Sequence, residues 1–333
     1  MALSARLIQG PVGRMAASRT KRILRRISPA ALLVLLSACG LVRCAPEPLD
    51  DAALDAVYSV ALAPPDASLS VYHIGHSLVG RDMPAMLAQL ADPGHEYASQ
   101  LGWGTTLRAH WEPAVSIRGF EQENDHPHFR AVKPALESGK YDALVLTEMV
   151  EIRDAIEYHD SWDYLQRWAA HARAGAPDIR IYLYETWPHR DGAEDWLTRL
   201  DRDLERYWKR EILHRALAAD PDRAPIHLIP AGQVLAEFAR AVDAQGGVGG
   251  LDDVAGLFLD EIHLNDLGMY MVALTHYAVL YHRDPVGLPH RLHRADGSPA
   301  DSPAPETARL MQETVRDVVA RHRDTGLRSA LPR

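Results

Sequence analysis

Three residues in two distant segments have the types and spacing of a nucleophile with its base. Ser77 lies in Gly75-His76-Ser77-Leu78, directly after a β-rich run. Far along the chain, His263 follows Asp260 by three residues and precedes an apolar helical stretch. If the segments meet, His263 can take the proton of the Ser77 hydroxyl while Asp260 holds the other ring nitrogen. Taken alone, the Ser77 segment is more typical of a helix-capping serine, and the His263 segment is equally typical of a helix N-terminus with capping residues.

A sheet must bring these segments together, and the hydropathy pattern predicts one. Extended apolar runs occupy residues 68–74, 97–104, 141–146, 179–184 and 226–229, and helical patterns occupy 84–90, 161–170, 197–213, 234–238, 267–281 and 305–322. This alternation predicts an α/β fold with a doubly wound parallel sheet. Such sheets bind ligands at the carboxyl ends of their strands, so the residues after each strand are the candidates for chemistry.

Three segments resemble the sequence blocks of the SGNH (GDSL-like) hydrolases. Residues 75–78 resemble the Gly-Asp-Ser-Leu block, with His76 in place of the acidic residue, and residues 260–263 match the Asp-x-x-His block. Residues 102–106 (Gly-Trp-Gly-Thr-Thr) resemble the second block, whose glycine N–H points into the oxyanion hole. The resemblance covers roughly residues 68–282.

The resemblance implies a flavodoxin-like sheet with helices on both faces, and an ester hydrolase or acyltransferase. In that family pattern Ser77 is the nucleophile, His263 is its base and Asp260 orients His263. The N–H groups of Ser77 and Gly104 then hold the oxyanion.

One block departs from the family pattern. The family usually has Gly-x-Asn after the third strand, where this chain has Leu146-Thr147-Glu148-Met149, which is closer to relatives with Gln-Glu. The resemblance then implies that the Thr147 hydroxyl replaces the missing donor, or that Glu148 binds substrate hydroxyls. Losing one oxyanion donor typically costs about 2.7–4 kcal/mol of barrier. Trp187, after the fourth strand, suits a sugar-binding rim or, equally, a packed loop.

The N-terminus has the composition of an export signal. Four basic residues at 21–26 precede an apolar run at 30–36, far shorter than the roughly 20 residues of a membrane span. Leu36-Ser37-Ala38-Cys39 resembles the lipobox of bacterial lipoproteins, which implies a lipid on Cys39 and an anchor in the cell envelope. Plain secretion with cleavage near Ala45 is the alternative. Because the segment before the apolar run is long, Met1 and Met15 are both candidates for the first translated residue.

The rest of the chain divides by composition. Residues 1–39 are the expected signal peptide, 40–66 a flexible tether rich in Pro, Ala and Asp, 67–285 the hydrolase-like domain, and 286–333 a C-terminal tail with one helix that packs on the domain. Without residues 1–39 the chain has 29 basic and 45 acidic residues. This charge repels polyphosphate and argues against nucleic acid as a partner.

No cofactor or metal is expected. The chain has two cysteines, Cys39 and Cys44, so the domain has no thiolate site. Asp125-His126-Pro127-His128 has the residue types of a metal site, but the proline restricts its geometry and a solvated loop is the favoured interpretation.

Two functions follow as hypotheses. The first is an esterase that removes an O-acyl or O-acetyl group from an envelope carbohydrate or a small ester, with Ser77, His263 and Asp260 as its triad. The alternative is a non-catalytic, lipid-anchored carbohydrate-binding protein on a degenerate hydrolase scaffold. The missing Gly-x-Asn block favours the alternative, and the coexistence of the three triad residues favours the enzyme.

Overall fold

A five-stranded parallel sheet forms the centre of the protein. The computed structural model describes residues 45–327, so the expected signal peptide with Cys39 lies outside the described residues. The strands are β1 (Ser70–His76), β2 (Glu96–Gly102), β3 (Ala143–Leu146), β4 (Arg180–Glu185) and β5 (Ile226–Pro230). Their order is β2-β1-β3-β4-β5, and each neighbouring pair is parallel. This is the flavodoxin-like order, which confirms the predicted fold class.

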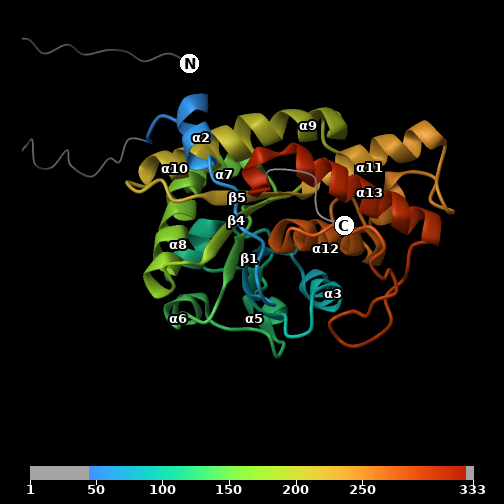
Figure 1. Ribbon diagram of the computed structural model, residues 1–333, viewed down its shortest axis with the longest axis horizontal. Coiled ribbons are helices and arrows are strands. Elements are labelled where there is room, and N and C mark those ends of the chain that lie inside the picture. The colour runs from blue at the N-terminus through green and yellow to red at the C-terminus, as the bar shows by residue number, and fades with distance from the viewer. Residues whose placement is uncertain (1–44, 328–333) are drawn as a thin grey trace, which may run out of the picture. The chain divides into compact units, whose positions relative to one another are not determined.

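Helices connect the strands and cover both faces of the sheet (Figure 1). Before β4 they are α2 (Asp51–Val57), α3 (Asp82–Leu90), α4 (Leu107–Trp111), α5 (Phe120–Asn124), α6 (Val132–Glu137), α7 (Ile152–His159) and α8 (Ser161–Gly175). After β4 they are α9 (Trp196–Asp203), η1 (Leu204–Leu213), α10 (His214–Ala219), α11 (Ala231–Gln245), η2 (Val254–Leu257), α12 (Asp266–Tyr281), α13 (Pro305–Arg321) and η3 (Arg323–Thr325).

Alternate strand residues pack into two separate cores. Val71 of β1 belongs to the core formed with α3, α11, α12 and α13, whereas the next residue, Tyr72, belongs to the core formed with α8, η1 and α10. Figure 1 shows α3, α12 and α13 on one side of the strands and α8 and α10 on the other. Burial on both faces explains why the strands are nearly continuous apolar runs in the sequence.

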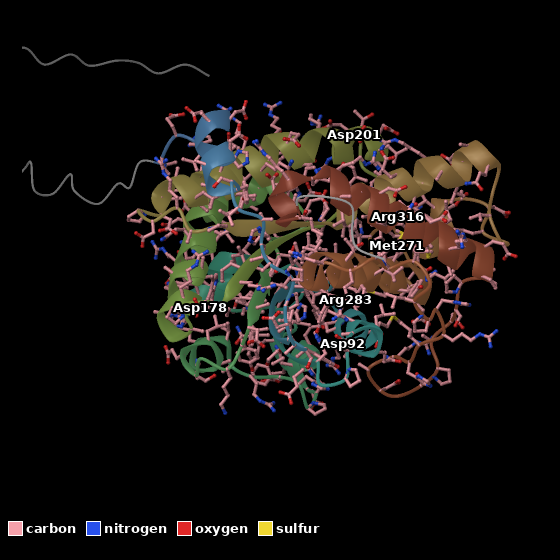
Figure 2. All side chains as sticks on the ribbon, viewed as in Figure 1. Asp92, Asp178, Asp201, Met271, Arg283 and Arg316 are labelled. Carbon is pink, nitrogen blue, oxygen red and sulfur yellow. The ribbon has the colours of Figure 1, made fainter. Side chains whose placement is uncertain are left out.

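The start of α12 fixes the segment that contains His263. The Asn265 side chain caps this helix by accepting the N–H groups of Leu267 and Gly268 at 3.0 and 3.3 Å. At the other end of α12, Arg283 forms a 2.6 Å ion pair with Asp92, which follows α3, and the two lie close together in Figure 2. Helix α12 is therefore held at both ends.

The long helix expected at 197–213 changes its winding. It begins as α9 and widens over Leu204–Leu213 into the π-helix η1, where the N–H of His214 reaches the carbonyl of Lys209 five residues back. The wider turn keeps Leu204, Trp208 and Leu213 buried together, although they are spaced by four and five residues.

The described part of the expected tether differs from the prediction. Residues 51–57 form α2, in which Leu54 is buried, and the Tyr58 hydroxyl donates to the Ile226 carbonyl of β5 at 2.7 Å. Leu54 and its apolar neighbours give this segment a packing face that the Pro- and Asp-rich composition does not reveal. The C-terminal helix α13 packs on α11 and α12 through residues such as Met311 and Val315. None of the helices within residues 45–327 has the length and hydropathy to span a bilayer.

Candidate active site

Ser77, His263 and Asp260 form a continuous chain of hydrogen bonds. Ser77 follows the last residue of β1, and its Oγ lies 3.0 Å from Nε2 of His263. The other ring nitrogen, Nδ1, lies 2.8 Å from Oδ2 of Asp260. Because a carboxylate only accepts, Nδ1 has the proton and Nε2 is the acceptor for the Ser77 hydroxyl. This is the arrangement that lets a serine lose its proton to an imidazole.

Asp260 is held in its ionised form by the loop that contains it. Its Oδ1 accepts the N–H groups of Ile262 and His263 at 2.8 and 2.7 Å, while Oδ2 accepts the imidazole. These bonds, the His263 N–H first among them, hold the pKa of Asp260 far below its usual range. The side chains of His263 and Asp260 are 41% and 55% exposed, so the pair is open to solutes.

The His76 side chain holds the turn before the serine in place. It is fully buried, its Nε2–H donates to the Glu148 carbonyl at 2.8 Å, and its Nδ1 accepts the Leu78 N–H at 3.3 Å. Burial lowers the pKa of His76 to about 4, so the ring is neutral at pH 7. The imidazole thus links the Ser77 turn to the end of β3.

Gly75 is required by the packing behind this turn. A Cβ at Gly75 would lie 2.6 Å from Cγ2 of Thr147 and 2.8 Å from a methyl of Val79, closer than real contacts allow. The Gly75 carbonyl also accepts Nε2–H of the buried His110 at 2.9 Å. These two contacts fix the end of β1 against Thr147, which follows β3, and against His110 of α4.

Of the predicted oxyanion donors, Gly104 lies at the cleft and Thr147 lies inside the sheet. Gly104 lines the same cleft as Ser77 and has a left-handed backbone, with φ of 53°. Thr147 is buried and its hydroxyl donates to the Tyr184 carbonyl of β4 at 2.8 Å. Its hydroxyl is used inside the sheet, so the structure does not bring it to the cleft as the sequence suggested.

Glu148 also differs from its expected place. Its side chain is completely buried, and Oε1 accepts the N–H groups of Leu107 at 3.3 Å and Met149 at 2.8 Å. Burial raises the pKa of Glu148 to about 7, although the donated hydrogen bonds oppose the rise. Glu148 therefore connects the end of β3 to the start of α4, instead of facing substrate hydroxyls.

Trp187 is buried too, and it supports the histidine loop. Its indole N–H donates to the Ile262 carbonyl at 2.8 Å. The neighbouring Arg190 donates its backbone N–H to the Glu261 carbonyl at 3.0 Å and its Nη2 to the Asp260 carbonyl at 3.2 Å. Three consecutive carbonyls, at residues 260 to 262, are thus held by the loop after β4. Sequence reasoning missed Arg190, because no pattern marks a loop residue that binds backbone.

An open cleft surrounds the Ser77–His263 pair. It has a volume of about 570 Å³ and is lined by Ser77, Trp103, Gly104, Arg118, Glu123, Val150, His189, Ile262 and His263. A second hollow of about 450 Å³ also touches Ser77 and His263, and Arg294 of the C-terminal tail lines it. The tail beyond residue 285 therefore contributes to the surroundings of the serine. Within residues 45–327, no group of three metal-binding side chains is found.

Comparison with known proteins gives only distant likenesses. No family model matches the chain, and no curated protein matches it. A DUF4886 family protein from Bacteroides uniformis has a TM-score of 0.46 at 16% identity, over 76% of this chain and 95% of its own. A GDSL-like lipase from Parabacteroides merdae has a TM-score of 0.39 at 14% identity, over 67% of this chain and 98% of its own.

A third solved structure is a carbohydrate esterase family 2 enzyme with a carbohydrate-binding domain, from Corynascus thermopiles (Myceliophthora fergusii). Its TM-score is 0.33 at 12% identity, over 66% of this chain and 67% of its own. The functional argument for this chain therefore depends on the geometry of its own site.

Proposed function

We propose that the protein is a serine ester hydrolase of the SGNH type, with Ser77, His263 and Asp260 as its triad. The observation that carries this proposal is the hydrogen-bond chain from Ser77 Oγ through His263 to Asp260, with steps of 3.0 and 2.8 Å. The two segments are 186 residues apart in sequence, and their convergence at the carboxyl edge of a parallel sheet is what such chemistry requires.

The reaction proceeds in two halves. Ser77 Oγ attacks the acyl carbon while its proton passes to Nε2 of His263, and Asp260 stabilises the resulting imidazolium. The tetrahedral intermediate collapses, the ester C–O bond breaks, and the leaving alcohol takes the proton from His263. Water then attacks the acyl-enzyme, gives a proton to His263, and releases the acid and the free Ser77 hydroxyl. No cofactor takes part.

The oxyanion hole consists of the N–H groups of Ser77 and Gly104. With the Thr147 hydroxyl used in the sheet, this hole lacks the side-chain donor that the family pattern would supply. One missing donor corresponds to about 2.7–4 kcal/mol of barrier. We therefore expect turnover about 10²- to 10³-fold below that of an enzyme with three donors.

We further propose that the substrate is an O-acyl or O-acetyl ester of an envelope carbohydrate, or a small ester. The proposed anchor is a lipid on Cys39, which would keep the domain in the bacterial cell envelope. The open cleft of about 570 Å³ beside Ser77 suits a substrate of one or two rings or a short ester.

A carbohydrate-binding protein without activity remains the second candidate, because the Thr147 hydroxyl is committed to Tyr184. A fluorophosphonate probe separates the two. The esterase must be labelled at Ser77, the Ser77→Ala variant must not be labelled, and the variant must also lose hydrolysis of p-nitrophenyl acetate. Absence of labelling in the folded wild-type protein would refute the enzyme and favour the binder.

A further inference from the structure

Trp103 presents an aromatic ring at the cleft. It is 46% exposed, and it lines the cleft together with Ser77 and His263. Gly102 and His76 are paired at the ends of β2 and β1, so Trp103 and Ser77 leave the sheet on adjacent strands, which lie about 4.8 Å apart. The indole and the serine are thus neighbours at the same edge.

The indole is fixed in place before any ligand arrives. The backbone N–H of Trp103 donates to the Arg118 carbonyl at 2.7 Å, and the indole Nε1–H donates to Oε1 of Glu123 at 2.6 Å. One face of the ring lies directly on Gly119, where an added Cβ would come within 2.2 Å of the indole Cδ2. Gly119 also has φ of 66°, a conformation that favours glycine. One face is therefore covered by backbone, and the exposed surface belongs to the rest of the ring.

Charged groups flank the ring in the same cleft. Glu123 and Arg118 both line it, and among the described residues the Arg118 guanidinium has no ion-pair partner. A rigid aromatic face binds the C–H face of a sugar ring, while a carboxylate and a guanidinium accept and donate hydrogen bonds to its hydroxyl and ester oxygens. The hydrocarbon part of an acyl chain has no hydrogen-bonding group for the Glu123 carboxylate or the Arg118 guanidinium.

We propose that Trp103, Glu123 and Arg118 form a subsite for a pyranose ring whose ester group reaches Ser77. This deepens the proposed function and rests on it for the reaction, but the binding step stands on its own contacts. It assigns to Trp103 the sugar-binding role that the sequence suggested for the buried Trp187. The substrate class is then an O-acylated sugar.

The kinetic test compares two acetate esters, glucose penta-acetate with a ring and vinyl acetate without one. For Trp103→Ala we expect the ratio of kcat/KM on the sugar ester to kcat/KM on vinyl acetate to fall about 10- to 100-fold, mainly through KM. Trp103→Phe keeps an aromatic face and should retain most of the ratio. Tyr158→Ala, which removes an exposed aromatic ring on α7, is the matched control and should leave the ratio unchanged.

Two kinetic results would overturn the subsite. One is an equal loss by Trp103→Ala on both esters. The other is a larger loss on vinyl octanoate than on glucose penta-acetate, because this result assigns Trp103 to the acyl chain. If Trp103→Ala does not fold, Glu123→Ala removes the acceptor that holds the indole while leaving the ring in the protein, and it should lower the same ratio.

A binding measurement separates this inference from the proposed function. Titration calorimetry of glucose penta-acetate into Ser77→Ala requires no turnover, and adding Trp103→Ala should weaken the affinity about tenfold or more. Hydrolysis of vinyl acetate without sugar binding refutes the subsite and keeps the hydrolase. Sugar binding that depends on Trp103, in a protein that hydrolyses neither ester, keeps the subsite and refutes the hydrolase.

Discussion

The indole N–H of Trp187 donates to the carbonyl oxygen of Ile262 at 2.8 Å, one residue before His263. Both residues are buried, so this bond is shielded from water and fixes the backbone that presents the imidazole. Arg190 holds the two preceding carbonyls. The loop after β4 therefore positions the proposed base, His263, whereas the proposed nucleophile, Ser77, lies in the loop after β1.

Replacing Trp187 with Phe tests this positioning role. The change keeps an aromatic ring but leaves the Ile262 carbonyl unpaired, which costs about 1–3 kcal/mol of stability. We expect kcat to fall about tenfold or more, with a smaller change in KM, because His263 loses its fixed orientation. Steady-state kinetics and thermal unfolding measure both effects. A variant that loses stability but keeps the wild-type kcat would show that Trp187 is only a packing residue.

Arg190 allows a second test on the same loop. Arg190→Ala removes the Nη2 donor to the Asp260 carbonyl and the ion pair to Glu261, while the backbone N–H bond to Glu261 stays. We expect a fall in kcat that added guanidinium partly restores. Glu261→Gln is the matched control, since it removes only the ion pair, in which the Glu261 side chain is 52% exposed, and a solvent-exposed pair contributes about 0–1 kcal/mol. If Glu261→Gln reduces kcat as much as Arg190→Ala, the carbonyl contact has no role.

The sequence was sufficient to predict the sheet and the three residues that form the hydrogen-bond chain, but not the remaining neighbours of the site. Short apolar runs that alternate with helical patterns indicate strands buried on both faces. In contrast, a polar residue after a strand satisfies whichever buried backbone group is nearest. The Thr147 hydroxyl therefore bonds to Tyr184, and the Glu148 carboxylate bonds to Leu107. Arg118 comes from a loop and Glu123 from the five-residue helix α5, and neither segment has a periodicity that marks it in the sequence, so only the folded chain places them in the cleft with Ser77.

Asp260→Asn tests the electrostatic role of the carboxylate. The amide keeps the volume and one oxygen, but it removes the negative charge that stabilises the imidazolium and favours the Nδ1–H tautomer. We expect kcat to fall about 10²- to 10⁴-fold, and KM to change little. Labelling by a fluorophosphonate should slow in parallel. Wild-type labelling rates in this variant would mean that the Asp260–His263 contact is structural.

Two substitutions of the buried Glu148 should differ in their effect on stability. Glu148→Gln keeps an oxygen for the N–H groups of Leu107 and Met149, whereas Glu148→Ala leaves both unpaired and should cost about 2–5 kcal/mol. The folded-state pKa of Glu148 is raised from 4.5 to about 7, so the folded protein retains a proton that the unfolded chain releases. The contribution of Glu148 to the free energy of unfolding therefore falls as pH rises from 4.5 to 7. The melting temperature of Glu148→Gln minus that of the wild type should be larger at pH 8 than at pH 5. The opposite trend would contradict a buried, neutral Glu148.

Buried histidines should make the fold sensitive to acid. Burial lowers the pKa of His76, His110 and His276 from 6.5 to about 4. Between these values the unfolded chain binds protons that the folded protein does not, so the free energy of unfolding falls as pH decreases from 6.5 to 4, and the stabilisation is complete above 6.5.

We therefore expect the melting temperature to drop steeply across that window in a series of calorimetric scans. His110→Gln keeps a donor for the Gly75 carbonyl but cannot titrate, so its melting temperature should depend less on pH than that of the wild type. The exposed His293 serves as control, because His293→Gln removes a group that is solvated in both states and should leave the slope unchanged. If all three proteins show the same slope, His110 binds its proton equally well in both states, and some other group limits acid stability.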